Sequence, residues 1–173
     1  MNTAAFFRPR RRTALISATA LAAMALSGCQ INSPVSTLLP YTPGDGIDMD
    51  GGSLAARDVL VVSHGDGAPG VVSGSLINEG AEAQTVTVSV NGTSVGDVTV
   101  EPHSLTRLDG VTVGDTPGKP TTVPAIETPA GQSIEVRFQV GSETLAADVP
   151  VLLPQGIYAD LADQAGGTVE PGN

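Results

Sequence analysis

Few side chains of this sequence have a setting that suggests chemistry, and the clearest is the only cysteine, Cys29. It follows Leu26-Ser27-Gly28, the small-residue pattern of a bacterial lipobox. In that pattern the chain is cut before the cysteine, which then carries a diacylglyceryl thioether and, on its freed amine, a further acyl chain such as palmitate. A lone cysteine has no partner for an internal disulfide. The sequence therefore predicts lipidation of Cys29.

The residues before Cys29 have the pattern of a secretory signal. Four arginines and no acid lie in the first twelve residues, and Thr13 to Leu26 is uncharged. This apolar run is shorter than the roughly 20 residues of a membrane-spanning helix. A basic start, a short apolar run and small residues before the cut predict a signal peptide over residues 1–28. The Arg11-Arg12 pair is compatible with twin-arginine export, and general secretion stays open as the alternative.

A second candidate chemistry is metal binding. After cleavage, His64, His103 and Met49 carry the only imidazole and thioether side chains of the chain. Copper(I) favours such ligands. The alternative is that both histidines are ordinary residues of surface loops, because a metal site normally has three or four protein ligands. Copper is therefore kept as a possible ligand, and no cofactor is predicted outright.

Two serine motifs resemble those of hydrolases. Gly92-Thr93-Ser94-Val95-Gly96 has the letters of a nucleophile elbow, but that elbow lies between a strand and a helix, and here two strands are expected. Ser63-His64-Gly65-Asp66 brings three triad-type residues together in sequence. A triad is defined by geometry in the fold and not by adjacency in the chain. We predict that the protein is not an enzyme.

An acidic cluster contains Asp45, Asp48 and Asp50. Calcium binds such oxygens, but the spacing of an EF-hand loop fails at Gly52. A solvated acidic linker is the preferred interpretation.

Charge and composition limit the classes of partner that the protein could bind. The whole chain has a net charge of −10. Removal of residues 1–28 takes four arginines, leaving four basic against 18 acidic residues and a net charge of −14. Such a chain is repelled by nucleic acid and by anionic lipid head groups. Only Tyr41, Phe138 and Tyr158 remain as aromatic residues, so stacking on bases or sugars is disfavoured.

The folded part is predicted to be all-β. Apolar residues, mostly valine, alternate with polar residues, most clearly in 85–90 and 134–140, and Gly and Pro separate the runs. Asn91-Gly92 predicts a type I′ hairpin turn, and the spacing of Val95 and Val98 beside Gly96 predicts a bulge. About seven strands at intervals of 8–12 residues are typical of a Greek-key β-sandwich.

Domain boundaries follow from these patterns. Residues 29–53 are rich in Pro, Gly and Ser and are predicted to form a flexible tether. Residues 54–153 are predicted to form the sandwich, with a long loop from Gly114 to Gly131. Residues 154–173 are predicted to be a partly disordered tail, in which Ile157, Tyr158 and Leu161 could form one helical turn.

Several of these strings also resemble those of a known group. The lipobox, Tyr41-Thr42-Pro43-Gly44-Asp45-Gly46, and the runs 57–62 and 70–78 are similar to those of small actinobacterial envelope lipoproteins, which are remotely similar to the PCu(A)C periplasmic copper chaperones. The resemblance implies an immunoglobulin-like or cupredoxin-like sandwich. The chaperone metal motif has a His-Met pair, a middle Met and a later His-x-Met. Here His64-Gly65 and His103-Ser104-Leu105 lack those methionines, so a thioether-rich copper(I) site is not expected.

The sequence thus favours a lipid-anchored, non-enzymatic β-sandwich on the extracytoplasmic face of the cell membrane. Its partners would be the membrane, through lipid on Cys29, and another envelope protein, and not nucleic acid. The alternative is a copper-binding protein or chaperone that uses His64 and His103.

Overall fold

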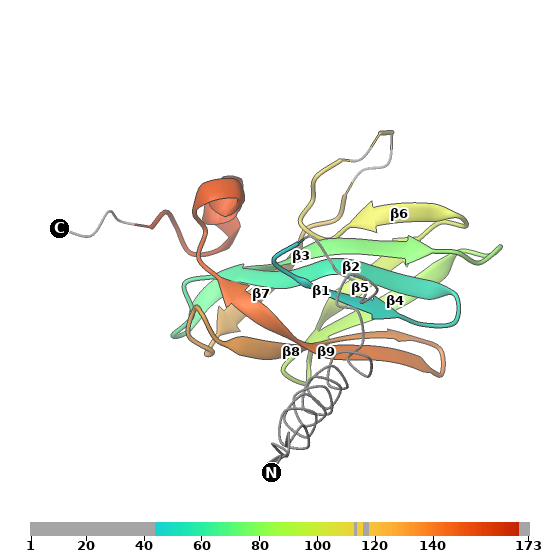
Figure 1. Cartoon of the computed structure of the whole chain (residues 1–173), viewed down its shortest axis with the longest axis horizontal. Coiled ribbons are helices and arrows are strands. Elements are labelled where there is room, and N and C mark those ends of the chain that lie inside the picture. Colours follow the sequence, from blue (N-terminus) through green and yellow to red (C-terminus); the bar gives the residue numbers. More distant parts are fainter. Residues whose placement is uncertain (1–43, 113, 116–117, 170–173) are drawn as a thin grey trace, which may run out of the picture. The chain divides into compact units, whose positions relative to one another are not determined.

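Nine β-strands and one short 3-10 helix make up the part of the chain that the structure describes, residues 44–112, 114–115 and 118–169. The computed structural model places these residues in one compact unit (Figure 1). Cys29 and the predicted signal peptide lie outside them. The elements are β1 (Ile47–Asp50), β2 (Leu54–Ser63), β3 (Ala68–Asn78), β4 (Gln84–Val90), β5 (Thr93–Val100), β6 (Ser104–Arg107), β7 (Thr121–Ile126), β8 (Ser133–Val140), β9 (Glu143–Leu152) and the 3-10 helix η2 (Gly156–Gln164).

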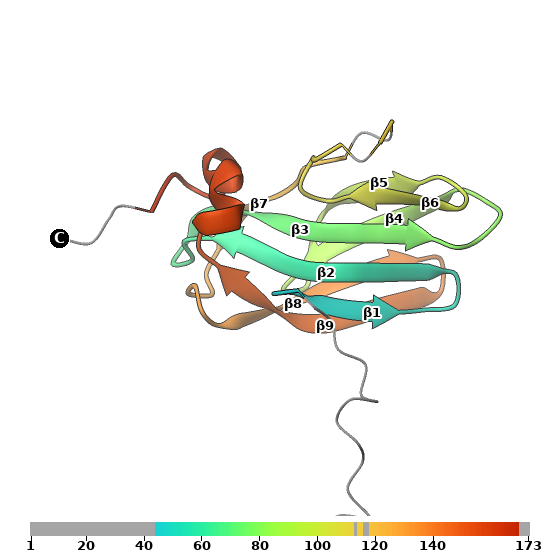
Figure 2. The ribbon, with the colours of Figure 1, turned by 45° about the horizontal axis from the view of Figure 1, so that its top comes forward.

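The strands form two layers that share one strand. Pairing runs in the order β5-β4-β8-β9-β2-β3-β6, while β1 pairs with β2 and β7 pairs with β3. Strand β9 is antiparallel to β8 over most of its length, and its last residues, Val151 and Leu152, run parallel to Val61 and Val62 of β2. Figure 2 shows β1, β2 and β3 side by side in one layer. The predicted all-β sandwich is confirmed, with nine strands where about seven were expected.

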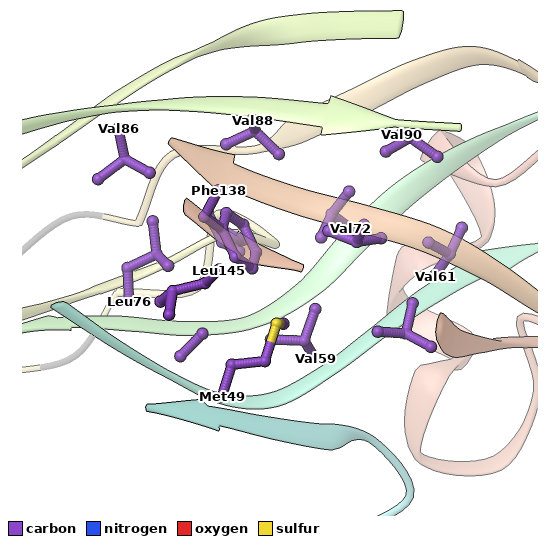
Figure 3. Close-up of a cluster of buried hydrophobic side chains, with 14 of the residues drawn as sticks. Met49, Val59, Val61, Val72, Leu76, Val86, Val88, Val90, Phe138 and Leu145 are labelled. Carbon is purple, nitrogen blue, oxygen red and sulfur yellow. The ribbon is translucent and has the colours of Figure 1, made fainter. Parts of the chain in front are cut away.

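The main core lies between the layers. On β4 the alternation puts Val86, Val88 and Val90 inward, at 0%, 0% and 3% exposure. On β8 the same period of two buries Phe138, the largest fully buried side chain of the described residues. Figure 3 shows these side chains facing Val72, Leu76 and the other inward residues of β2 and β3. Burial of these aliphatic side chains removes apolar surface from water and stabilises the sandwich.

Strand β2 is buried on both faces. Val59 and Val61 point into the main core, whereas Leu60 and Val62 belong to a second cluster that includes Leu161 of η2. The helix contacts β2 and β3 (Figure 2). An apolar run without alternation is typical of a strand covered on both sides. The predicted helical turn of the tail therefore exists, and residues up to Ala165 are packed against the domain.

The hairpin of β4 and β5 matches its prediction in detail. Asn91 and Gly92 have φ values of 47° and 75°, as a type I′ turn requires. Val88 pairs with Gly96 and Ser89 with Ser94, so the extra residue of the predicted bulge is Val95. Val95 is half-buried and packs against the edge of the core.

Two strands were not predicted. Residues 47–50, which the sequence placed in the tether, form β1 and pair with β2, so the ordered domain starts earlier than residue 54. Residues 121–126, which the sequence placed in a long loop, form β7 and pair with β3. Pro124 lacks a main-chain N–H, which is tolerated in an edge strand. No helix among the described residues has the length and hydropathy to cross a membrane.

Candidate functional site

The two histidines proposed as metal ligands lie at opposite ends of β3. His64 follows Ser63, which pairs with Gly70, whereas His103 precedes Ser104, which pairs with Asn78. A strand rises about 3.3 Å per residue, so these two ends of β3 are about 26 Å apart. Metal–nitrogen bonds are about 2.0–2.1 Å long. The two imidazoles therefore cannot share one ion within a domain.

Met49 is separate from both histidines. Its side chain is 7% exposed and lies in the core between the layers, close to Val59 and Leu145 in Figure 3. The His64 Nε2 is 2.9 Å from the main-chain oxygen of Gly167. His103 is exposed and has a φ of 50°. Among the described residues no three His, Cys, Asp or Glu side chains gather around a common point, and the proposed set His64, His103 and Met49 is not brought together.

A titration of the full chain with copper(II) tests this separation. We expect the effects of His64→Ala and His103→Ala on copper affinity to add in the double variant, because sites more than about 7–10 Å apart are independent. The single variants and the double variant are compared by calorimetry. A tight site that disappears with either substitution alone would contradict the separation.

The serine motifs serve the turns in which they lie. The Ser63 Oγ donates to the main-chain oxygen of Pro69 at 2.8 Å and accepts from the N–H of Gly65 at 3.0 Å. Its hydroxyl therefore bonds the β2–β3 turn, while the His64 ring bonds elsewhere. Ser94 is exposed on β5 in the hairpin, with a strand and no helix after the turn. Neither motif forms a serine–histidine pair.

The three acids of the predicted linker are distributed over separate contacts. Asp45 Oδ2 accepts from the Tyr158 hydroxyl at 3.1 Å, and Asp50 Oδ1 accepts from Arg57 at 2.5 Å. Asp48 Oδ1 accepts from the N–H of Asp58 at 2.9 Å. Asp48 and Asp50 thus hold β1 against β2, and Asp45 joins the start of the domain to η2. The interpretation of this segment as a solvated linker is therefore wrong from Asp45 onward.

A charged pocket of about 240 Å³, which the sequence did not reveal, lies on the outer side of β2, β3 and β6 next to η2. We call it the Asp109 pocket. Its lining residues are Asp58, Ser73, Arg107, Asp109, Val111, Ile157, Tyr158, Asp160 and Leu161.

Asp109 is the anchor of this pocket. Its side chain is 2% exposed. It accepts hydrogen bonds from Arg107 Nε at 3.0 Å, from Arg107 Nη2, from Ser73 Oγ at 3.1 Å and from the N–H of Val111 at 3.1 Å. Burial by itself raises the pKa of Asp109, but the bonds from Arg107, Val111 and Ser73 outweigh it and hold that pKa below its usual value. The carboxylate is thus a fully bonded structural ion.

Tyr158 and Asp58 join the pocket to the start of the domain. Burial, followed by the hydrogen bond to Asp45 and the charges of Asp45 and Asp58, raises the pKa of Tyr158 to about 12. Asp58 has a φ of 52° at the bulge of β2, and its Oδ1 accepts from the N–H of Gly46 at 2.8 Å. Gly74 lies opposite, where a Cβ would come within 2.9 Å of the Arg57 oxygen. The hydrogen bonds of Tyr158 to Asp45 and of Asp58 to Gly46 therefore hold the segment Gly44–Gly46 and the helix η2 against the same sheet.

A larger groove of about 620 Å³ opens at the edge of the sandwich. We call it the β5–β7 groove. Its walls are the hairpin from Val90 to Val95 and the segment from Thr122 to Glu127, and Ile134 of β8 lies at its base. No pattern in the sequence indicates this groove, because its two walls are far apart in the chain and β5 and β7 pair with different strands.

Comparison with known proteins finds no protein family that matches the sequence and no curated protein that is similar to it. Among solved structures, a copper-bound PCuAC domain from PmoF2 is similar in fold, with a TM-score of 0.46 and 11% sequence identity. The match covers 62% of this chain and 99% of that domain. The remote similarity to PCu(A)C domains is thus also found in the structure. At this level it concerns the fold alone, and membership of the actinobacterial lipoproteins stays a prediction.

Proposed function

We propose that this protein is a lipid-anchored, non-enzymatic β-sandwich that binds another component of the cell envelope at the outer face of the cytoplasmic membrane. The observation that carries the binding role is the β5–β7 groove. Its volume of about 620 Å³ falls within the roughly 300–1,000 Å³ of ligand pockets. Aliphatic walls with a few polar groups are also typical of such pockets.

The lipobox at Leu26–Cys29 supports the anchored position. The chain between Cys29 and Gly44 reaches about 50 Å when extended, which allows the domain to work clear of the bilayer. A net charge of −14 after cleavage disfavours contact with nucleic acid and with anionic head groups. The acyl chains on Cys29 would then attach the protein to the membrane. Two acyl chains anchor a protein stably, whereas one chain does so only marginally.

Metabolic labelling with a clickable fatty-acid analogue tests the anchor. We expect the wild-type chain, expressed in a bacterium that processes lipoproteins, to be labelled and to sediment with membranes, because the Cys29 thiol carries the lipid. Cys29→Ala should lose the label. Ser36→Ala, which leaves the lipobox intact, is the matched control and should keep it. Equal labelling of the wild type and Cys29→Ala would show that the anchor is not at this cysteine.

A further inference from the structure

The β5–β7 groove lies where the wall of strands is open. Among the described strands, β5 pairs only with β4 and β7 pairs only with β3, so each leaves one edge without a neighbouring strand. The groove runs between these two edges and reaches the core. Its deep surface includes Val90, Val123, Ile126 and Ile134, which are 3%, 6%, 1% and 6% exposed.

The two free edges are poorly suited to pairing with an added peptide strand. Pro124, in the middle of β7, has no N–H to donate. On β5, the main-chain oxygen of Asp97 already accepts a hydrogen bond from the Lys119 ammonium. Proline and lysine at sheet edges oppose strand addition. An extended peptide would therefore lose hydrogen bonds at Pro124 and at Asp97, so a ligand that needs no main-chain partners fits the groove better.

The charges around the groove determine which head group an apolar ligand could carry. Glu127 is the one ionisable residue among those that line it, and the remaining polar lining is uncharged, namely Asn91, Thr93, Ser94 and Thr122. The whole chain is also strongly acidic, with a formal net charge of −10. An anionic head group at the mouth would meet Glu127 and find no cation, whereas a neutral or cationic head group is compatible with this potential.

We propose that the β5–β7 groove binds the aliphatic chain of an amphiphile whose head group is neutral or cationic. The chain of the ligand lies on the valine and isoleucine side chains of the groove, and its head group lies at the polar mouth near Glu127. This inference rests on the proposed function, since it names the chemical class of the envelope component that the domain binds.

The test uses the full chain with Cys29→Ala, so that no covalent acyl chain competes for the groove. Binding of the neutral fluorophore N-phenyl-1-naphthylamine is measured first, and then its displacement by monomyristoylglycerol, dodecylammonium and myristate, each below its micellar concentration. We expect saturable probe binding and displacement by the neutral and cationic amphiphiles, with myristate at least about tenfold weaker. Absence of probe binding, or preference for myristate, would overturn the proposal.

Two substitutions place a carboxylate on opposite walls of the groove. Val95→Glu changes a half-buried residue of β5, and Ala125→Glu changes an exposed residue of β7 that should not disturb folding. Each should weaken probe binding about tenfold or more, because an ionised group is costly beside an apolar ligand. Thr99→Glu adds the same charge to an exposed position of β5 outside the groove and should leave binding unchanged. Equal probe binding by all variants would show that the ligand does not bind in the β5–β7 groove.

Displacement of the probe by an extended aliphatic peptide but by none of the amphiphiles would overturn the ligand class. Failure of the anchor is separate, because it is measured by the fatty-acid label on Cys29. A labelled chain whose groove binds no amphiphile would refute this inference alone. An unlabelled wild-type chain that binds amphiphiles in the groove would refute the anchor alone.

Discussion

Phe138→Ala is expected to lower the free energy of unfolding by about 3–5 kcal/mol, the usual cost of truncating a buried aromatic side chain. Phe138 is 0% exposed and lies at the centre of the core between the two layers (Figure 3). Its removal would leave a cavity lined by valines and leucines of both layers, which strands held by hydrogen bonds cannot easily collapse to fill. Urea unfolding followed by circular dichroism measures the effect.

A surface substitution provides the comparison for Phe138. Ile157 is 81% exposed, so Ile157→Ala should change the free energy of unfolding by no more than about 0.5 kcal/mol. A loss of less than about 1 kcal/mol in Phe138→Ala would mean that this side chain does not join the two layers.

Asp109→Asn is expected to cost about 2–3 kcal/mol, because it removes a buried charge that bonds Arg107 twice. The partial exposure of Arg107, at 33% of its side chain, keeps the cost below that of a fully buried pair. Asparagine keeps the size of the side chain, but its single oxygen can accept from Val111, which bonds Oδ1, or from Ser73, which bonds Oδ2, and not from both. The same urea titration at neutral pH measures the difference.

The pH dependence of that difference follows from the lowered pKa of Asp109. A carboxyl whose pKa is lower in the folded state stabilises the fold above its unfolded pKa of about 3.9 and loses this contribution as the pH falls through the folded value. The gap between the wild type and Asp109→Asn should therefore be largest near neutrality and narrow below about pH 4.

The matched control is the surface pair of Glu135 and Arg137, whose atoms are 3.0 Å apart and whose side chains are 40% and 43% exposed. Glu135→Gln should cost no more than about 0.5 kcal/mol, because exposed ion pairs are screened by water and salt. If Asp109→Asn were equally mild and showed no dependence on acid pH, the buried ion pair would not be stabilising the sheet.

Strands with a clear period of two were predictable, and those that depend on their neighbours were not. β4 and β8 alternate in sequence because one face of each lies on the core. In β1, by contrast, Met49 is the single buried residue and acidic residues flank it. Their charges meet Arg57 of β2, a partner that no local pattern reveals. In β7, Pro124 argued against a strand in the sequence. The sheet tolerates this proline because β7 lies at an edge.

The sites depend on register and topology, which short sequence patterns do not determine. His64 and His103 gave a possible ligand pair by residue type, but pairing along β3 places them at opposite ends of the domain. Asp109 and Arg107 are close in sequence, but Ser73, which also bonds Asp109, comes from another strand. The two sides of the β5–β7 groove likewise come from distant segments. Residue types could suggest chemistry here, and only the fold could show which residues meet.

Strand β9 pairs with a strand of each layer, and this affects how the protein folds. Its last residues pair with β2, near the start of the domain, and its body pairs with β8. Contacts between segments so distant in sequence slow folding, because the chain between them must be ordered first. A chain that crosses a membrane from its N-terminus cannot join its two layers until β9 has also crossed. For export by general secretion, one of the two routes that the sequence leaves open, we therefore expect the polypeptide to stay unfolded, and open to proteases and chaperones, until translocation is almost finished.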